Sequence, residues 1–135
     1  MEFDPERLKR SAEQAAGASY SPYSRFRVGA ALLCQDDTII TGTNVENRSY
    51  GLTICAERSA VAAAVSQGHR SFIAIAVYCP DSAEPVPPCG ACRQVLSEFA
   101  PPETPVFFGA RGGFKETTVG ELYPFDSLHE LKKGR

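Results

Sequence analysis

A chain of 135 residues that is 43% hydrophobic and 22% charged has the length and composition of one globular domain, which excludes a disordered or fibrous protein. No segment approaches the roughly 18 consecutive apolar residues of a membrane span, and the charged residues 1–10 lack the apolar core of a secretory signal. The net charge of −2 disfavours nucleic-acid binding, which needs clustered Lys and Arg. We therefore expect a single domain over residues 1–135 of a cytoplasmic protein with neither a nucleic acid nor a membrane as partner.

The first part of the chain predicts a helix followed by a β-hairpin. Asp4 and Pro5 supply an N-cap and a first-turn proline for a helix that ends near residue 18. Residues 28–34 predict a buried strand, and residues 39–42 predict its antiparallel partner after a turn.

The rest of the chain alternates between helices and strands. Helical patterns cover residues 55–66 and 89–99, and a short helix at 119–122 has Thr118 as its cap. Strands are predicted at 105–108 and at 72–78, which is apolar throughout and therefore central. This order predicts an α/β fold whose mixed sheet carries helices on its faces, with helix N-termini gathered at one edge.

Five cysteines carry most of the chemical information in the sequence. An odd number without a recognisable signal disfavours a disulfide framework and favours metal binding or catalysis. Cys34 and Cys79 lie in apolar strand contexts, so we expect them to be buried for packing. We expect His69 and His129 at the surface, in a loop and in the tail.

Cys89-Gly90-Ala91-Cys92 places two thiols three residues apart at a predicted helix start. Such a pair shares one helix face, and its sulfurs can approach the separation of roughly 4 Å that one tetrahedral zinc requires. Alone, this motif also fits a thioredoxin-like redox pair, half of a structural zinc knuckle, or two core cysteines.

Cys55, at another predicted helix start, is the candidate third ligand. Structural zinc sites usually have four protein ligands, whereas catalytic sites keep three and leave one position for water. Glu57 can face the same metal only from the first turn of the helix, because residues i and i+2 diverge in a helix interior. The alternative for Glu57 is an acidic residue that merely satisfies the helix dipole.

Cys55-Ala56-Glu57 followed by Pro88 and the Cys89–Cys92 pair resembles the signature of zinc deaminases, in which a Glu that is not a ligand serves as general acid and base. Residues 20–32, 42–47 and 49–53 are also similar to the small homotetrameric cytidine deaminases. This similarity extends over about residues 8–123.

The resemblance implies a three-layer α/β/α sandwich with a mixed five-stranded sheet and helices on both faces. It implies one Zn²⁺ per chain on Cys55, Cys89 and Cys92, with Glu57 as the catalytic residue, in a homotetramer. The implied reaction is the hydrolytic deamination of free cytidine and deoxycytidine to uridine and deoxyuridine plus ammonia, in pyrimidine salvage.

The same resemblance implies a set of substrate-binding residues: Phe26, Asn44, Val45, Glu46 and Ala56. Asn44 and Glu46 would bind the ribose hydroxyls, Phe26 would pack against the base or ribose, and the Ala56 N–H would hold the pyrimidine. Arg58 would offset the charge of −1 that Zn²⁺ has with three thiolates, although an ordinary surface role for Arg58 is the alternative.

Two positions depart from the family pattern. Arg27 stands where family members commonly have Pro. In the family a late Phe from a neighbouring subunit completes the base pocket, and Phe125 is the candidate here despite an atypical local sequence.

Three other functions remain open on the residues alone. One is deamination of an aminonucleoside antibiotic. Another is deamination of a base in RNA or single-stranded DNA, which would usually show a His ligand and a basic surface. The third is a structural zinc domain that binds a partner, which predicts a closed four-ligand site and no role for Glu57, Asn44 or Glu46.

Overall fold

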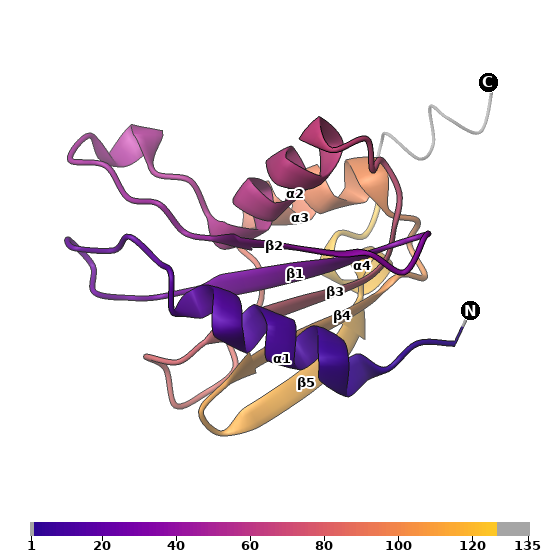
Figure 1. The fold of residues 1–135 in the computed structure, drawn as a ribbon, viewed down its shortest axis with the longest axis horizontal. Helices are drawn as coiled ribbons and strands as arrows, with labels where there is room; N and C mark the ends of the chain where they lie inside the picture. The colour runs from indigo at the N-terminus through magenta and orange to yellow at the C-terminus, as the bar shows by residue number, and fades with distance from the viewer. Residues whose placement is uncertain (1, 127–135) are drawn as a thin grey trace.

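The computed structural model describes residues 2–126, whose centre is a five-stranded sheet in the order β2-β1-β3-β4-β5 (Figure 1). The strands are β1 (Gly29–Cys34), β2 (Ile39–Thr43), β3 (Phe72–Cys79), β4 (Pro105–Ala110) and β5 (Gly113–Thr118). β3 and β4 are parallel, and the other neighbouring pairs are antiparallel. The predicted mixed sheet is confirmed.

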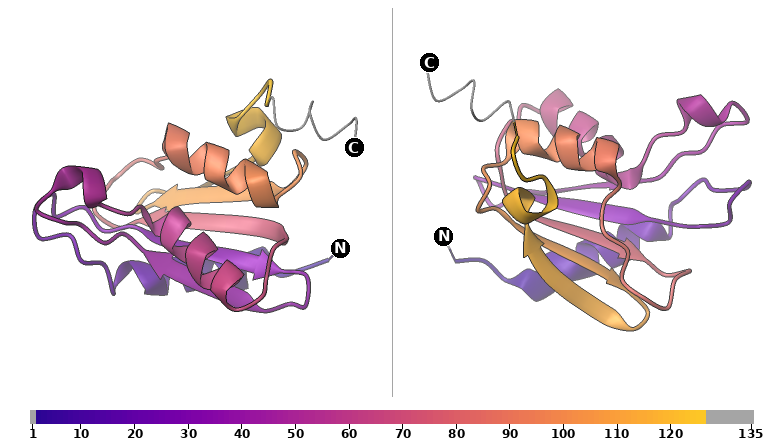
Figure 2. Two further views of the ribbon diagram at one scale, coloured as in Figure 1. Left: turned by 90° about the horizontal axis from the view of Figure 1, so that it is seen from above. Right: turned by 180° about the vertical axis from the view of Figure 1, so that it is seen from behind.

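Helices cover both faces of this sheet. They are α1 (Pro5–Ala16), α2 (Ala56–Ser66), α3 (Gly90–Phe99) and α4 (Val119–Leu122), with a 3-10 turn η1 (Tyr50–Leu52). α1 packs on one face, while α2 and α3 contact each other on the opposite face (Figure 2). The expected three-layer α/β/α sandwich is therefore confirmed. None of the helices described has the length and apolar character needed to cross a membrane.

β3 shows why a central strand is apolar throughout. Ala74 and Ala76 pack toward α1, whereas Ile75 and Val77 pack toward α2 and α3. Successive side chains of a strand point to opposite faces, and here both faces are buried. β5 is the opposite case, an edge strand with largely exposed polar side chains. The residue pattern alone does not indicate it, and only the family resemblance implies a fifth strand.

The helix starts follow the predicted caps. Asp4 Oδ1 accepts the Glu6 N–H at 3.0 Å, and Thr118 Oγ1 accepts the Glu121 N–H at 3.1 Å. α1 ends at Ala16, slightly earlier than expected.

Two glycines let helices lie directly on the strands. A Cβ added at Gly29 would lie 2.0 Å from the Ala12 carbonyl oxygen of α1, and one at Gly42 would lie 2.3 Å from the Ala60 nitrogen of α2. No side chain fits at either position without displacement. Gly42 therefore fixes how closely α2, which carries part of the candidate site, approaches the sheet.

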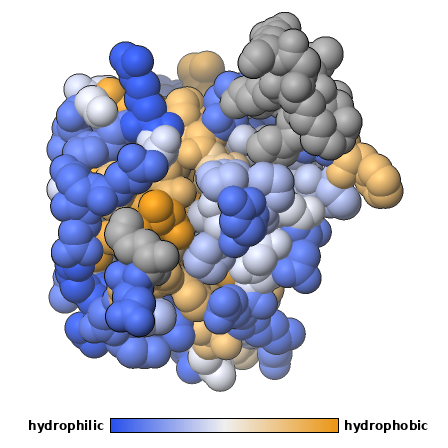
Figure 3. Space-filling model, turned by 90° about the vertical axis from the view of Figure 1, so that its right-hand side faces the viewer, coloured by the Kyte–Doolittle hydropathy of each residue, from blue (hydrophilic) through white to orange (hydrophobic). Residues whose placement is uncertain are grey.

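The two ends of the sheet differ in character. Figure 3 shows the end that carries the turn between β1 and β2, where hydrophilic side chains dominate the surface. A pocket lies at the other end, where β3 ends and α2 and α3 begin.

Candidate active site

Three thiols converge where α2 and α3 begin. The Sγ atoms of Cys55 and Cys89 are 3.9 Å apart, and those of Cys89 and Cys92 are 3.3 Å apart. All three lie within 4.8 Å of one another. Tetrahedral zinc with bonds of about 2.3 Å to sulfur needs sulfurs roughly 4 Å apart, so this donor set fits zinc.

Local structure explains this convergence. Cys55 and Cys89 are the N-cap residues of α2 and α3, in extended conformation, and neither side chain caps its own helix. Their sulfurs are free to turn toward each other, and Cys92 follows in the first turn of α3. Two helix N-termini place partial positive charge beside the thiols. The cysteines precede or begin the helices, as the motif requires.

Arg58 lies against this cluster. Its Nη2 donates a hydrogen bond of 3.3 Å to Cys55 Sγ. Hydrogen bonds from Cys92 and Arg58 lower the pKa of Cys55, which favours its thiolate, whereas the hydrogen bond to Cys55 raises the pKa of Cys92. Metal ligands must be deprotonated, and the contact with Arg58 favours that state at Cys55.

Glu57 lies in the first turn of α2, where the chain can present it to the same centre as Cys55. Its side chain is 5% exposed and lines the pocket. Burial raises the pKa of Glu57 to about 7, and the negative charge of Cys55 adds to this rise. A carboxyl group with this pKa can both accept and donate a proton near neutral pH.

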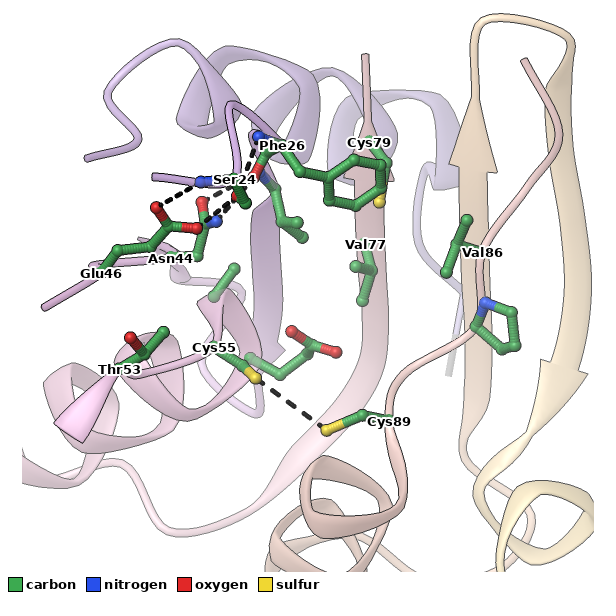
Figure 4. A pocket seen from close by; sticks show the side chains of 14 residues that line it. Ser24, Phe26, Asn44, Glu46, Thr53, Cys55, Val77, Cys79, Val86 and Cys89 are labelled. Carbon is green, nitrogen blue, oxygen red and sulfur yellow. Dashed lines mark hydrogen bonds between the residues drawn. The ribbon is translucent and has the colours of Figure 1, made fainter. Parts of the chain in front are cut away.

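These groups border a cavity of about 440 Å³, which is within the usual size range of small-molecule sites. In the close view, Cys55 and Cys89 face each other at one end of this cavity (Figure 4). Glu46, Asn44 and Ser24 lie together at one side, and Phe26 extends toward Cys79. The cavity is therefore bordered by thiols, a buried acid, polar side chains and an aromatic ring.

Asn44 is held rigidly in the cavity wall. Its Nδ2 donates to the Phe26 carbonyl at 2.8 Å, and its Oδ1 accepts the Val28 N–H at 3.0 Å and the Ser19 hydroxyl. The amide retains one further N–H that can reach a ligand.

Glu46 is held in a similar way. Its Oε1 accepts the N–H groups of Tyr23 and Ser24 at 3.0 and 3.1 Å, and its Oε2 accepts the Ser24 hydroxyl. The hydrogen bond from the Ser24 side chain is the main reason that the pKa of Glu46 is lowered.

The other predicted site residues differ in position. Ala56 lines the cavity, and its N–H belongs to the first turn of α2, where helix donors have no partner within the helix. Val45 is not among the lining residues, and its backbone pairs with Ile54 in both directions at 2.9 Å. Phe125 is fully exposed, with a φ of 56°.

Several lining residues were not predicted individually: Ser24, Val28, Thr53, Val77, Cys79, Val86 and Pro87. Ser24 and Thr53 lie inside the segments that carry the family resemblance, and this is the signal that could have found them. Cys34 and Cys79 are buried, as expected, but Cys79 also borders the cavity. His69 is partly buried, with 22% of its side chain exposed, and its Nδ1 lies 3.9 Å from Asp36 Oδ1. His129 lies outside the described residues.

Residues 3–108 match the family model described as the cytidine and deoxycytidylate deaminase zinc-binding region. The chain belongs to this deaminase family. A cytidine deaminase of Halalkalibacterium halodurans is 53% identical over 123 residues, which are 90% of this chain and 92% of the relative. The crystal structure of a cytidine deaminase from Burkholderia pseudomallei superposes with a TM-score of 0.86 at 42% identity, covering 91% of this chain and 98% of that one.

A blasticidin-S deaminase of Bacillus cereus is also similar, with 36% identity over 108 residues that cover 75% of this chain and 76% of the relative. The region that matches the family model contains Cys55, Cys89 and Cys92, which form the possible metal site found among residues 2–126. The chain is therefore a zinc-dependent hydrolytic deaminase of this family.

Proposed function

We propose that this deaminase converts free cytidine and deoxycytidine to uridine and deoxyuridine with release of ammonia, in pyrimidine salvage. The observation that carries this proposal is that one cavity is bordered by Glu57, by Cys55 and Cys89 of the thiol cluster, and by the polar pair Asn44 and Glu46. An acid beside a thiol cluster that fits zinc suits hydrolysis, and an amide donor together with a carboxylate acceptor suits sugar hydroxyls.

Zinc, when held by Cys55, Cys89 and Cys92, supplies a Lewis acid that lowers the pKa of water. Glu57 accepts a proton from the attacking water and delivers it to N3 of the pyrimidine while the water oxygen adds at C4. Glu57 then takes the remaining water proton from the new C4 hydroxyl and passes it to the amino group. The C4–N bond breaks to release ammonia and leaves a carbonyl at C4. Its pKa of about 7 suits both transfers.

Two groups beside Glu57 support this chemistry. The Ala56 N–H, which has no partner in the helix, is proposed to hold the pyrimidine. Arg58, 3.3 Å from Cys55, is proposed to offset the negative charge of three thiolates on zinc, which otherwise makes water harder to ionise.

The sugar end of the cavity supports a nucleoside. Asn44 and Glu46 are proposed to bind ribose hydroxyls, because each is fixed by its own hydrogen bonds and retains capacity for one more. Phe26 is proposed to pack against the base or ribose. Direct substrate contact by Val45 stays a prediction. Its pairing with Ile54 fixes the Asn44–Glu46 segment relative to the start of α2.

A homotetramer is part of the proposal. The segments flanking β1 and β2 extend beyond the sheet (Figure 1) and expose large hydrophobic side chains there: Tyr20, Tyr23, Tyr50, Leu52 and Ile54. A group of exposed large hydrophobic side chains is typical of a protein interface. Phe125 is fully exposed in the single chain, which suits its proposed role in the pocket of a neighbouring subunit. Light scattering at several concentrations tests the tetramer.

We place the enzyme in the cytoplasm, with a free nucleoside rather than nucleic acid as partner. All five cysteines are free, which suits a reducing compartment. The net charge of −2 disfavours binding to a phosphate backbone.

The test is to incubate the zinc-loaded protein separately with cytidine, deoxycytidine and blasticidin S and follow the ultraviolet change. We expect turnover of the first two. Turnover of blasticidin S alone would favour the antibiotic deaminase instead. Turnover of none, with one zinc retained per chain, would contradict the proposal and favour a structural zinc domain.

A further inference from the structure

Phe26 lies on a short segment that is anchored on its N-terminal side by Glu46. Tyr23 and Ser24 donate their N–H groups to the Glu46 carboxylate, and the Ser24 hydroxyl donates to it as well. The same hydroxyl oxygen accepts the Phe26 N–H at 3.0 Å. Ser24 therefore links the backbone of Phe26 to the proposed sugar-binding carboxylate.

A second carboxylate anchors the C-terminal side of the segment. Asp81 Oδ2 accepts the Arg27 N–H at 2.8 Å and the Arg27 Nε–H at 3.0 Å, and Oδ1 accepts from Nη2 at 2.7 Å. Two parallel bonds between guanidinium and carboxylate define both distance and orientation. The third bond holds the backbone directly after Phe26.

Asp81 is itself on a fixed loop. The N–H groups of Arg111 and Gly112, at the turn between β4 and β5, donate to the carbonyls of Ser82 and Ala83, both at 3.1 Å. This loop continues to Val86 and Pro87, which line the cavity, and then to Cys89. Arg27 is therefore tied to the loop that leads to the proposed zinc ligands.

The backbone between these anchors does not hold this shape by itself. Arg25 has a φ of 56°, in the left-handed region that residues other than Gly adopt at a cost. Surrounding contacts must maintain such a conformation. The Glu46 and Asp81 anchors lie on either side of it.

We infer that Arg27 and Asp81 are positioning residues for the nucleoside pocket, because their bidentate pair fixes Phe26 relative to the loop that carries Val86, Pro87 and Cys89. The inference rests on the proposed function in one respect: its kinetic test measures the turnover of cytidine. The pair contributes little to global stability, since 49% of the Arg27 side chain and 26% of the Asp81 side chain are exposed. Its effect is expected in substrate binding.

The kinetic test is a double-mutant cycle of Arg27→Ala, Asp81→Ala and the double variant, each with zinc content measured. Each single substitution is expected to raise KM for cytidine about fivefold with kcat nearly unchanged, and the double variant to do no more than either single. The inference would be overturned if the KM changes of the two single substitutions multiplied in the double variant. A fall in kcat together with a loss of zinc would also overturn it.

Arg7→Ala is the matched control. Arg7 pairs with Asp37 at 3.3 Å, is similarly exposed, and joins α1 to the turn between β1 and β2, away from the cavity. Its loss is expected to leave KM unchanged. An equal rise in KM would show that any exposed ion pair has this effect and would overturn the assignment.

Hydrogen exchange separates this inference from the proposed function. In Arg27→Ala and Asp81→Ala, amides of residues 23–28 are expected to exchange faster than in the wild type, and in Arg7→Ala they are not. This readout needs no turnover, so it holds even if the wild type does not deaminate cytidine. Unchanged exchange in both single variants would overturn the positioning role.

Discussion

Arg58 and Cys55 form a direct contact at the start of α2, with Nη2 of the guanidinium 3.3 Å from Sγ of the thiol. The contact places a permanent positive charge beside a proposed zinc ligand. Because three thiolates leave a zinc centre with net negative charge, this arginine is the group in the described structure best placed to compensate it.

Arg58→Gln is expected to reduce kcat/KM or zinc affinity about 10- to 100-fold, the usual cost of losing a group that supports a metal ligand. Arg58→Lys, which keeps the charge but not the planar group, is expected to recover part of that loss. Steady-state kinetics with zinc analysis measures both. Arg10→Gln, on the exposed face of α1, is the control, and equal losses in the two variants would contradict the assigned role.

Cys55→Ser is expected to leave well under one zinc per chain after mild chelation, because a hydroxyl is a poor replacement for a thiolate ligand. Cys34→Ser is the matched control, since Cys34 is fully buried in β1 and belongs to the hydrophobic core. Cys34→Ser is expected to keep zinc but to unfold at a lower temperature, because burial takes the serine hydroxyl away from its hydrogen bonds with water. Equal retention of zinc by both variants would remove Cys55 from the ligand set.

Gly42→Ala is expected to lower the free energy of unfolding by about 1–3 kcal/mol or more, because the new methyl group overlaps the backbone of α2. Gly51→Ala has open space around the added carbon and is expected to change stability little. Chemical denaturation compares the two. Similar stabilities would contradict the close packing of α2 on β2.

The Arg27–Asp81 pair is expected to be insensitive to pH over the working range of the enzyme. Hydrogen bonds from Arg27 lower the pKa of Asp81 to about 2, below the value of about 3.9 expected in the unfolded chain. The stability that this carboxylate contributes is therefore complete above the unfolded value and is lost as pH falls toward 2. The difference in melting temperature between wild type and Asp81→Ala should be constant from pH 8 to 5, and a change within that window would contradict the pair.

Local patterns predicted most of the fold. The apolar run of β3, the proline-closed α3 and the caps at Asp4 and Thr118 are set by short-range chemistry, and the structure confirms them. β5 could not be found this way, because a polar edge strand exposes much of its surface and lacks a hydrophobic pattern.

The same distinction between local and long-range information applies to the candidate site. The spacing of Cys55, Cys89 and Cys92 predicted a cluster, because two helix starts bring the thiols together. The contact of Arg27 with Asp81 spans 54 positions of the chain and depends on how two loops pack. No local pattern carries that information, so the structure was needed to explain the arginine.

The role of Glu57 as the group that moves protons is the central claim, and Glu57→Gln tests it most directly. The variant has nearly the same shape and should keep one zinc per chain and the wild-type fold. Its turnover of cytidine should fall by a factor of about 10²–10⁴, the usual contribution of general acid–base catalysis. A zinc-loaded, folded Glu57→Gln enzyme with more than a few per cent of wild-type kcat would contradict the account.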